Sequence, residues 1–104
     1  MSSRQPARAA DGGATPGAEA RAIVANKRGL HARAAPRLVQ LAEGYRAEVR
    51  VACRGVSVRG TSVMGLLSLA AGLGSELVIT AEGPEAAVAV AAFVALVQSK
   101  FDED

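Results

Sequence analysis

Apolar and polar positions follow strand-like patterns in four places along the chain. Residues 20–26 form a short segment that is β-branched at its centre, which is typical of a strand. Residues 46–52 and 76–82 alternate between apolar and polar side chains, so each segment predicts a strand with one buried and one solvent-exposed face. Val56 and Val58 continue the alternation after a three-residue turn (C-R-G), which predicts a β-hairpin.

Three other segments have helical spacing. Apolar residues recur with that period over 31–43, with Pro36 early enough in the helix for its missing N–H to be tolerated. A short apolar helix is predicted over 62–70, with Thr61 or Ser62 as its cap, and a last helix begins near Pro84. The apolar stripe of the last helix comprises Val90, Val94, Val97 and Phe101.

The predicted element order is βαββαβα, without an internal repeat. Four strands with wet outer faces require an antiparallel sheet that is covered on one face only, and the two long helices supply that cover. The predicted fold class is therefore α+β, with a single domain over residues 20–104. Residues 1–19 are rich in Ala, Gly, Ser and Pro and lack an apolar period, so we predict a flexible tail.

The composition limits the kinds of functional site and the cellular location that we expect for this chain. The chain has 104 residues, half of them apolar but few aromatic, which predicts a thin core of Ala, Val, Leu and Ile and chemistry at the surface. A single cysteine, Cys53, and a single histidine exclude an internal disulfide and favour neither zinc nor another metal. No apolar run is long enough for a membrane span and no secretory signal is evident, so we expect a cytoplasmic protein without membrane association.

The net charge of +2 hides an asymmetry along the chain. Residues 21–59 carry nine Lys or Arg against two Glu, whereas residues 60–104 carry one Lys against six acids. A basic half is typical of proteins with an anionic ligand or an acidic partner surface. The alternative is that folding scatters these charges over solvated faces.

His31 stands where the first predicted strand gives way to a helix. The first N–H groups of a helix have no internal partner and, with the helix dipole, they favour a bound phosphate. The backbone amides of Ala32 and Arg33 are candidates for this role, and the Arg33 guanidinium can bind phosphoryl oxygens with two hydrogen bonds. An imidazole that is neutral near pH 7 is a nucleophile suited to reversible phosphoryl transfer.

On position alone, His31 could equally be a surface residue that caps a helix. The sequence has no acid–histidine–nucleophile set and no Gly-rich loop ending in Gly-Lys-Ser/Thr, so hydrolase triads and nucleotide-binding loops are not predicted. We expect no cofactor and no metal.

Two stretches of the chain resemble the signatures of a known family. Residues 29–35 (GLHARAA) resemble the active-site signature of the histidine-containing phosphocarrier HPr of the bacterial phosphotransferase system. Residues 61–69 (TSVMGLLSL) resemble that family's second motif. The resemblance extends over about residues 20–104, including motif spacing and element order.

The resemblance implies an open-faced β-sandwich and a phosphocarrier function. His31 would accept a phosphoryl group on Nδ1 from enzyme I, which is charged by phosphoenolpyruvate, and Arg33 matches the active-site arginine. The acceptor would be an enzyme IIA-type protein. Such a carrier is a monomeric, stoichiometric intermediate in phosphotransfer and not a stand-alone catalyst.

The chain departs from most sugar-transport members of the family at one position. Those members have Pro directly after the active-site arginine, whereas this chain has Ala34, with Pro36 two residues further on. Ala32 and residues 26–29 (NKRG) are more similar to the nitrogen-related, NPr-like branch. These features favour a regulatory phosphorelay over bulk sugar uptake.

The second motif contains three further candidate residues. Ser62 is a candidate N-cap, and it matches the regulatory serine that HPr kinase phosphorylates in many relatives, so both roles stay open. A phosphate there would place negative charge where an acidic partner docks. By the same resemblance, Met64 and Leu67 would form an apolar docking patch beside His31 and Arg33.

Other features of the sequence allow two alternative functions. A binding-only regulator controlled by phosphorylation of Ser62 would not need His31, and the presence of both His31 and Arg33 argues against it. Nucleic-acid binding by the basic half has little support, because aromatic residues for base stacking are scarce and no DNA- or RNA-binding motif occurs.

Overall fold

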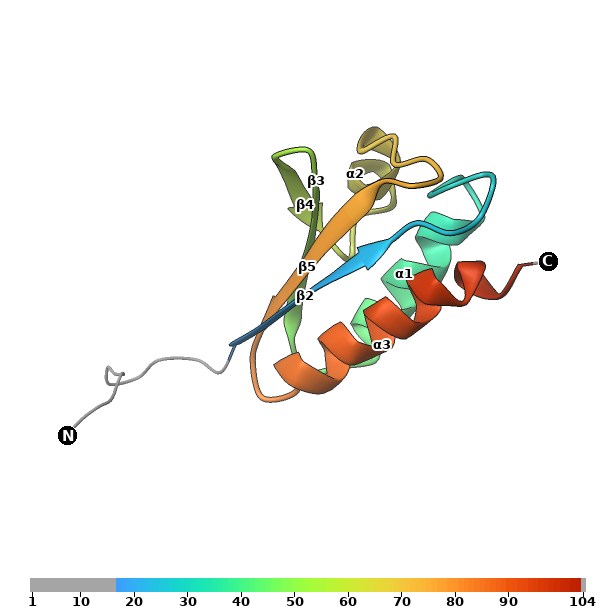
Figure 1. Cartoon of the computed structure of the whole chain (residues 1–104). Helices are drawn as coiled ribbons and strands as arrows, with labels where there is room; N and C mark the ends of the chain where they lie inside the picture. The colour runs from blue at the N-terminus through green and yellow to red at the C-terminus, as the bar shows by residue number, and fades with distance from the viewer. Residues whose placement is uncertain (1–16, 104) are drawn as a thin grey trace.

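A computed structural model describes residues 17–103 of the chain as an antiparallel sheet with helices packed against one face (Figure 1). The strands pair in the order β2-β5-β3-β4, all antiparallel. Both the α+β class and the element order βαββαβα agree with the prediction. The elements in chain order are β2 (Gly17–Ile23), α1 (Ala34–Glu43), β3 (Glu48–Cys53), β4 (Val56–Arg59), α2 (Val63–Ser68), β5 (Glu76–Glu82), α3 (Ala86–Gln98) and the short 3-10 helix η1 (Lys100–Asp102).

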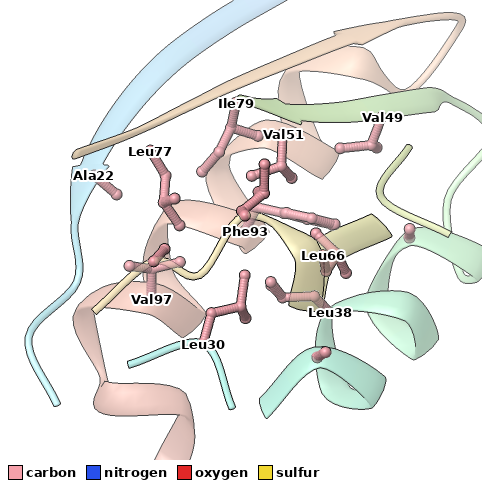
Figure 2. Packing of buried hydrophobic residues seen from close by; sticks show 14 of the residues in the cluster. Ala22, Leu30, Leu38, Val49, Val51, Leu66, Leu77, Ile79, Phe93 and Val97 are labelled. Atoms are coloured by element: carbon pink, nitrogen blue, oxygen red, sulfur yellow. The ribbon is translucent and has the colours of Figure 1, made fainter. Parts of the chain in front are cut away.

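The core lies between the sheet and the two long helices (Figure 2). Alternate residues of β3 and β5 point into it, as the sequence pattern predicts, and α3 contributes a fully buried Phe93 that the predicted stripe did not include. Leu38 of α1 and Leu66 of α2 are also fully buried, so all three α-helices share one core. Burial of these apolar side chains is the main contribution that holds the helices on the sheet.

Several element boundaries differ from the prediction. Strand β2 begins at Gly17, because the segment from Gly17 onward pairs with β5 in the register Gly17↔Glu82. Residues 17–19 of the predicted tail therefore belong to the sheet, and the rest of that tail lies outside the described residues. Cys53 is the last, buried residue of β3 and not part of the turn, whereas Val56 on the edge strand is exposed.

The chain turns sharply after α3. The predicted stripe runs to Phe101, but α3 ends at Gln98 and residues Lys100, Phe101 and Asp102 adopt left-handed backbone conformations with φ of 60°, 56° and 60°. Phe101 is nevertheless fully buried. The pattern was therefore right about burial and wrong about the backbone that achieves it. Within residues 17–103, no helix has the length and apolar character that crossing a membrane requires.

Candidate functional site

The loop between β2 and α1 is held tightly against the segment that follows α2. The Leu30 N–H donates a hydrogen bond of 2.8 Å to the Ala71 carbonyl. Gly29 has a φ of +66°, and a Cβ at this position would lie 2.3 Å from the Ala71 oxygen. Only glycine combines this backbone conformation with so close an approach. The loop that carries His31 is therefore fixed to the rest of the fold by a backbone-to-backbone contact.

His31 lies three residues before the first residue of α1, so the predicted helix start at residue 31 is wrong. The His31 carbonyl accepts hydrogen bonds of 3.0 Å from the N–H groups of Ala34 and Ala35, and Arg33 is the N-cap. The Arg33 N–H donates to Nδ1 of the His31 ring at 3.1 Å. The His31 carbonyl thus accepts from the first N–H groups of α1, and the His31 ring is held by the Arg33 N–H. The site therefore forms from the turn that precedes the helix.

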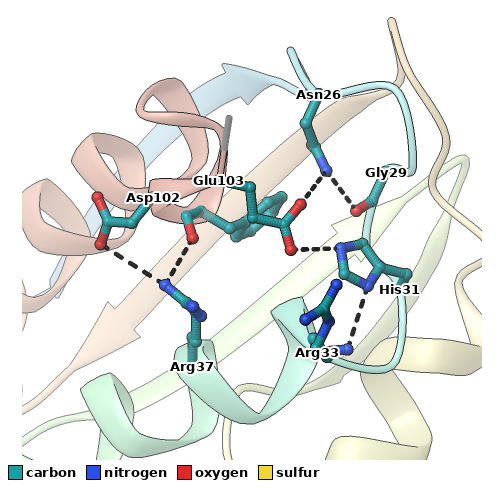
Figure 3. A network of polar contacts seen from close by, with 8 residues as sticks. Asn26, Gly29, His31, Arg33, Arg37, Asp102 and Glu103 are labelled. Carbon is teal, nitrogen blue, oxygen red and sulfur yellow. Dashed lines mark hydrogen bonds and ion pairs between the residues drawn. The ribbon is translucent and has the colours of Figure 1, made fainter.

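The other ring nitrogen faces a carboxylate that the sequence analysis did not identify. His31 Nε2 is buried and lies 2.7 Å from Oε2 of Glu103, an ion-pair distance, although the ring N–H is not aligned on that oxygen as a regular hydrogen bond requires (Figure 3). The side chains of His31 and Glu103 are 17% and 19% exposed, so water reaches the pair only partly. The contact with His31 holds the pKa of the Glu103 carboxyl below its ordinary value of 4.5, with smaller contributions from the charges of His31, Arg33 and Arg28, and outweighs the opposing effect of burial.

Two further residues hold the C-terminal turn over His31. Asn26 donates from Nδ2 to the Gly29 carbonyl at 2.9 Å and to Glu103 Oε1 at 3.5 Å. Arg37 donates to the Phe101 carbonyl at 2.8 Å and lies 4.0 Å from the Asp102 carboxylate. Left-handed backbone costs roughly 1–2 kcal/mol for each non-glycine residue, so these contacts and the burial of Phe101 are what maintain the turn.

A basic hollow of about 560 Å³ opens beside this cluster. Four cations line it, together with Asn26 and two C-terminal acids: Lys27, Arg28, Arg33, Arg37, Asp102 and Glu103. Folding therefore gathers part of the basic half at one place instead of scattering it. Other basic residues pair with acids on exposed faces, as Arg21 does with Glu76 at 3.4 Å and Arg59 with Glu48 at 3.8 Å. The gathered cations suit an anionic group next to His31.

Comparison with known proteins gives the family. Residues 18–99 match the sequence profile of the PTS-HPr family, described as the PTS HPr component phosphorylation site. The chain belongs to the HPr family of the phosphotransferase system. It is thus a member of a family of histidine phosphocarriers, and membership implies enzyme I and enzyme IIA-type proteins as partners.

Named relatives and solved structures agree with this assignment. The phosphocarrier protein HPr of Cupriavidus necator is 40% identical over 77% of this chain and 90% of its own length. The phosphocarrier protein NPr of Shewanella violacea is also 40% identical, over 82% of this chain and 93% of its own length. A crystal structure of HPr-C-His from Thermoanaerobacter tengcongensis superimposes with a TM-score of 0.79 and 36% identity, covering 84% of this chain and 98% of the other. Identity alone does not separate the HPr and NPr branches.

The ionised state of Glu103 makes the stability of this HPr-family protein depend on pH. Because the folded-state pKa is lowered, the carboxylate contributes stability that is fully present above about pH 4.5 and is lost as pH falls through the lowered pKa. We expect the free energy of unfolding to fall less steeply with acidification in Glu103→Gln than in the unmodified protein. Urea denaturation at neutral pH and in steps below pH 4.5 measures this, and equal slopes in the two proteins would refute it.

Ser62 of the HPr-family second motif is the N-cap of α2. Its Oγ accepts a hydrogen bond of 2.9 Å from the Gly65 N–H, and its backbone is extended, as an N-cap requires. The sequence left the choice of cap between Thr61 and Ser62 open, and the structure places Ser62 there. Capping is therefore an observed role of Ser62, while its phosphorylation stays a proposal.

Replacement of Ser62 tests the capping contribution. We expect Ser62→Ala to lower the free energy of unfolding by about 1 kcal/mol, because the Gly65 N–H loses its partner. Thr61→Ala is the matched control, since Thr61 is exposed and does not cap the helix. Chemical denaturation of both variants distinguishes them, and equal losses would contradict the assignment of the cap.

The two predicted docking residues have different environments. Met64 is 76% exposed, more than any other large apolar side chain in residues 17–103. Leu67 is half-buried and packs against the core, and the adjacent Leu66 is fully buried. Because α2 packs against α1, Met64 is the member of the pair that is free to contact a partner protein.

Proposed function

We propose that His31 is the phosphoryl acceptor of this HPr-family protein and that it relays the group from enzyme I to an enzyme IIA-type protein. The observation that carries the proposal is the orientation of the ring. Nε2 is occupied by Glu103, whereas Nδ1 faces the Arg33 N–H at the start of α1 through a hydrogen bond at the surface. Nδ1 is therefore the nitrogen that can meet a phosphoryl donor.

The transfer step requires little rearrangement of the chain. The Nδ1 lone pair attacks phosphorus, and the bond between phosphorus and its donor atom on enzyme I breaks, with the electron pair returning to the donor. The Arg33 N–H must leave Nδ1 before the attack, because both use the same lone pair, and it is then free to donate to a phosphoryl oxygen. We propose that the N–H of Ala32 donates to the same group. The Arg33 guanidinium supplies charge to the same group.

Phosphorylation in solution tests this proposal. The purified protein is incubated with phosphoenolpyruvate and a phosphotransferase-system enzyme I, and its intact mass is followed. We expect one phosphoryl group per chain that is lost in mild acid, as a phosphorus–nitrogen bond requires. No mass increase, or an acid-stable group, would contradict the proposal.

We further propose that the relay is of the nitrogen-related, NPr-like type and operates in the cytoplasm. Ala32, the stretch 26–29 and Ala34 in place of the sugar-branch proline support this branch. Pro36 stands within the first turn of α1, where it costs no helical hydrogen bond, so the helix start does not need a proline at position 34. The phosphorylated protein should transfer its group faster to a nitrogen-type enzyme IIA than to a sugar-type one, and the reverse preference would refute the branch.

Regulation at Ser62 and docking through Met64 and Leu67 complete the proposal. A kinase with HPr-kinase character would place roughly two negative charges on Ser62, close to Met64 on the same short helix. We expect this charge to weaken docking of an acidic partner face and so to slow phosphoryl transfer. The exposure of Met64 supports its place in that interface. The binding-only alternative draws on the same exposure of Met64, but it gives no role to the contacts that His31 makes with Arg33 and Glu103.

A further inference from the structure

We propose that Glu103 is a positioning residue for phosphoryl transfer at His31. Its carboxylate holds the imidazole ring in the tautomer that presents the Nδ1 lone pair to the donor. The inference rests on the proposed function of His31 and assigns a role to a residue that neither family motif contains.

The hydrogen bond at Nδ1 sets the tautomer of the ring, and the ion pair at Nε2 is consistent with it. A backbone N–H can only donate, so the 3.1 Å contact from Arg33 requires a lone pair on Nδ1. The ring proton of neutral His31 must then reside on Nε2. An ionised carboxylate can only accept, and Oε2 of Glu103 lies 2.7 Å from that nitrogen (Figure 3). When one ring nitrogen of a histidine lies next to a carboxylate, the carboxylate favours the tautomer with the proton on that nitrogen and fixes the orientation of the ring.

The surroundings of Glu103 hold it at this place. Asn26, only 2% exposed, links Glu103 Oε1 to the Gly29 carbonyl in the His31 loop. On the other side, buried Phe101 anchors the C-terminal turn, and its carbonyl accepts a hydrogen bond from Arg37 of α1. Glu103 is therefore attached both to the loop that carries His31 and to the helix that follows it.

The negative charge of the Glu103 carboxylate also stabilises the ring while it carries the phosphoryl group. When neutral Nδ1 forms a bond to phosphorus, the proton stays on Nε2 and the ring acquires positive charge. The Glu103 carboxylate at 2.7 Å offsets that charge, as carboxylates behind reactive histidines do. When the group moves on, the nitrogen–phosphorus bond breaks, its electron pair returns to Nδ1, and the ring becomes neutral again. The lowered pKa of Glu103 keeps the carboxylate ionised throughout.

The test compares two isosteric variants that each remove one negative charge. Glu103→Gln removes the carboxylate at Nε2, whereas Glu48→Gln removes one that pairs with Arg59 on β4. Two quantities are measured for each variant and for the unmodified protein. The first is the tautomer of His31 from ¹⁵N NMR shifts of the ring, which are unambiguous because the chain has one histidine. The second is the rate of phosphoryl acceptance from phosphorylated enzyme I.

We expect Glu103→Gln to show a mixture of tautomers and a rate lower by about tenfold, by analogy with carboxylates that orient metal-bound histidines. Glu48→Gln should match the unmodified protein in both measurements. An unchanged tautomer, an unchanged rate, or an equal loss in the two variants would overturn the role of Glu103. If the unmodified protein accepts no phosphoryl group, the proposed function fails, while the tautomer still shows whether Glu103 positions the ring.

Discussion

Replacement of His31 by glutamine is expected to abolish phosphorylation by enzyme I. The chain has a single histidine, and a glutamine amide cannot form the phosphorus–nitrogen bond. Glutamine is polar and can still accept from the Arg33 N–H through its side-chain oxygen, so α1 should keep its start and the protein should stay folded. Intact-mass analysis after incubation with phosphoenolpyruvate and enzyme I measures the effect.

The control for this experiment addresses the other candidate acceptor. Ser62→Ala removes the hydroxyl of the second motif and leaves His31 in place, so it should be phosphorylated to the same extent as the unmodified protein. Circular dichroism confirms that both variants are folded. A glutamine variant that still gains one acid-labile phosphoryl group would show that the acceptor is another residue.

The second large effect is expected on stability, from Gly29→Ala. The new methyl group would lie 2.3 Å from the Ala71 oxygen and 2.7 Å from the Gly72 Cα, and a φ of +66° is unfavourable for alanine. Both contacts are with backbone, so the loop must move and the hydrogen bond between Leu30 and Ala71 must weaken. We expect a loss of roughly 2–4 kcal/mol in the free energy of unfolding, measured by urea denaturation.

Gly55→Ala is the control that measures the cost of a positive φ without a steric clash of the new methyl group. Gly55 also has a positive φ, of +82°, but a Cβ there would meet nothing within 4 Å. We expect a loss of about 1 kcal/mol, which is the cost of the backbone conformation alone. Similar losses at Gly29 and Gly55 would contradict the close packing of the His31 loop against the segment after α2.

The sequence predicted the parts of the site that depend on local signals. The position of His31 just before a helix follows from a change of period and from the motif at 29–35, and the Ser62 cap follows from a polar residue before an apolar run. The predicted helix start is three residues too early, because His31 precedes the N-cap Arg33 and only accepts from Ala34 and Ala35 through its carbonyl. A difference of a few residues at the start of a helix is invisible to periodicity.

The C-terminal half of the site could not be predicted in the same way. Phe101 continues the spacing of the α3 stripe, and that spacing reports burial but not the handedness of the backbone. The left-handed conformations at Lys100, Phe101 and Asp102 are stabilised by tertiary contacts from Arg37 and the core, which lie far away in the sequence. The approach of Glu103 to His31 follows from that turn, so it required a three-dimensional structure.

The most direct test of the central claim is the chemical position of the phosphoryl group. The ¹⁵N-labelled protein is phosphorylated by enzyme I, and NMR coupling between phosphorus and the ring nitrogens of the single histidine identifies the bonded atom. We predict that phosphorus is bonded to Nδ1 of His31, since Nε2 is buried against Glu103. A phosphoryl group on Nε2, or on any residue other than His31, would contradict this account.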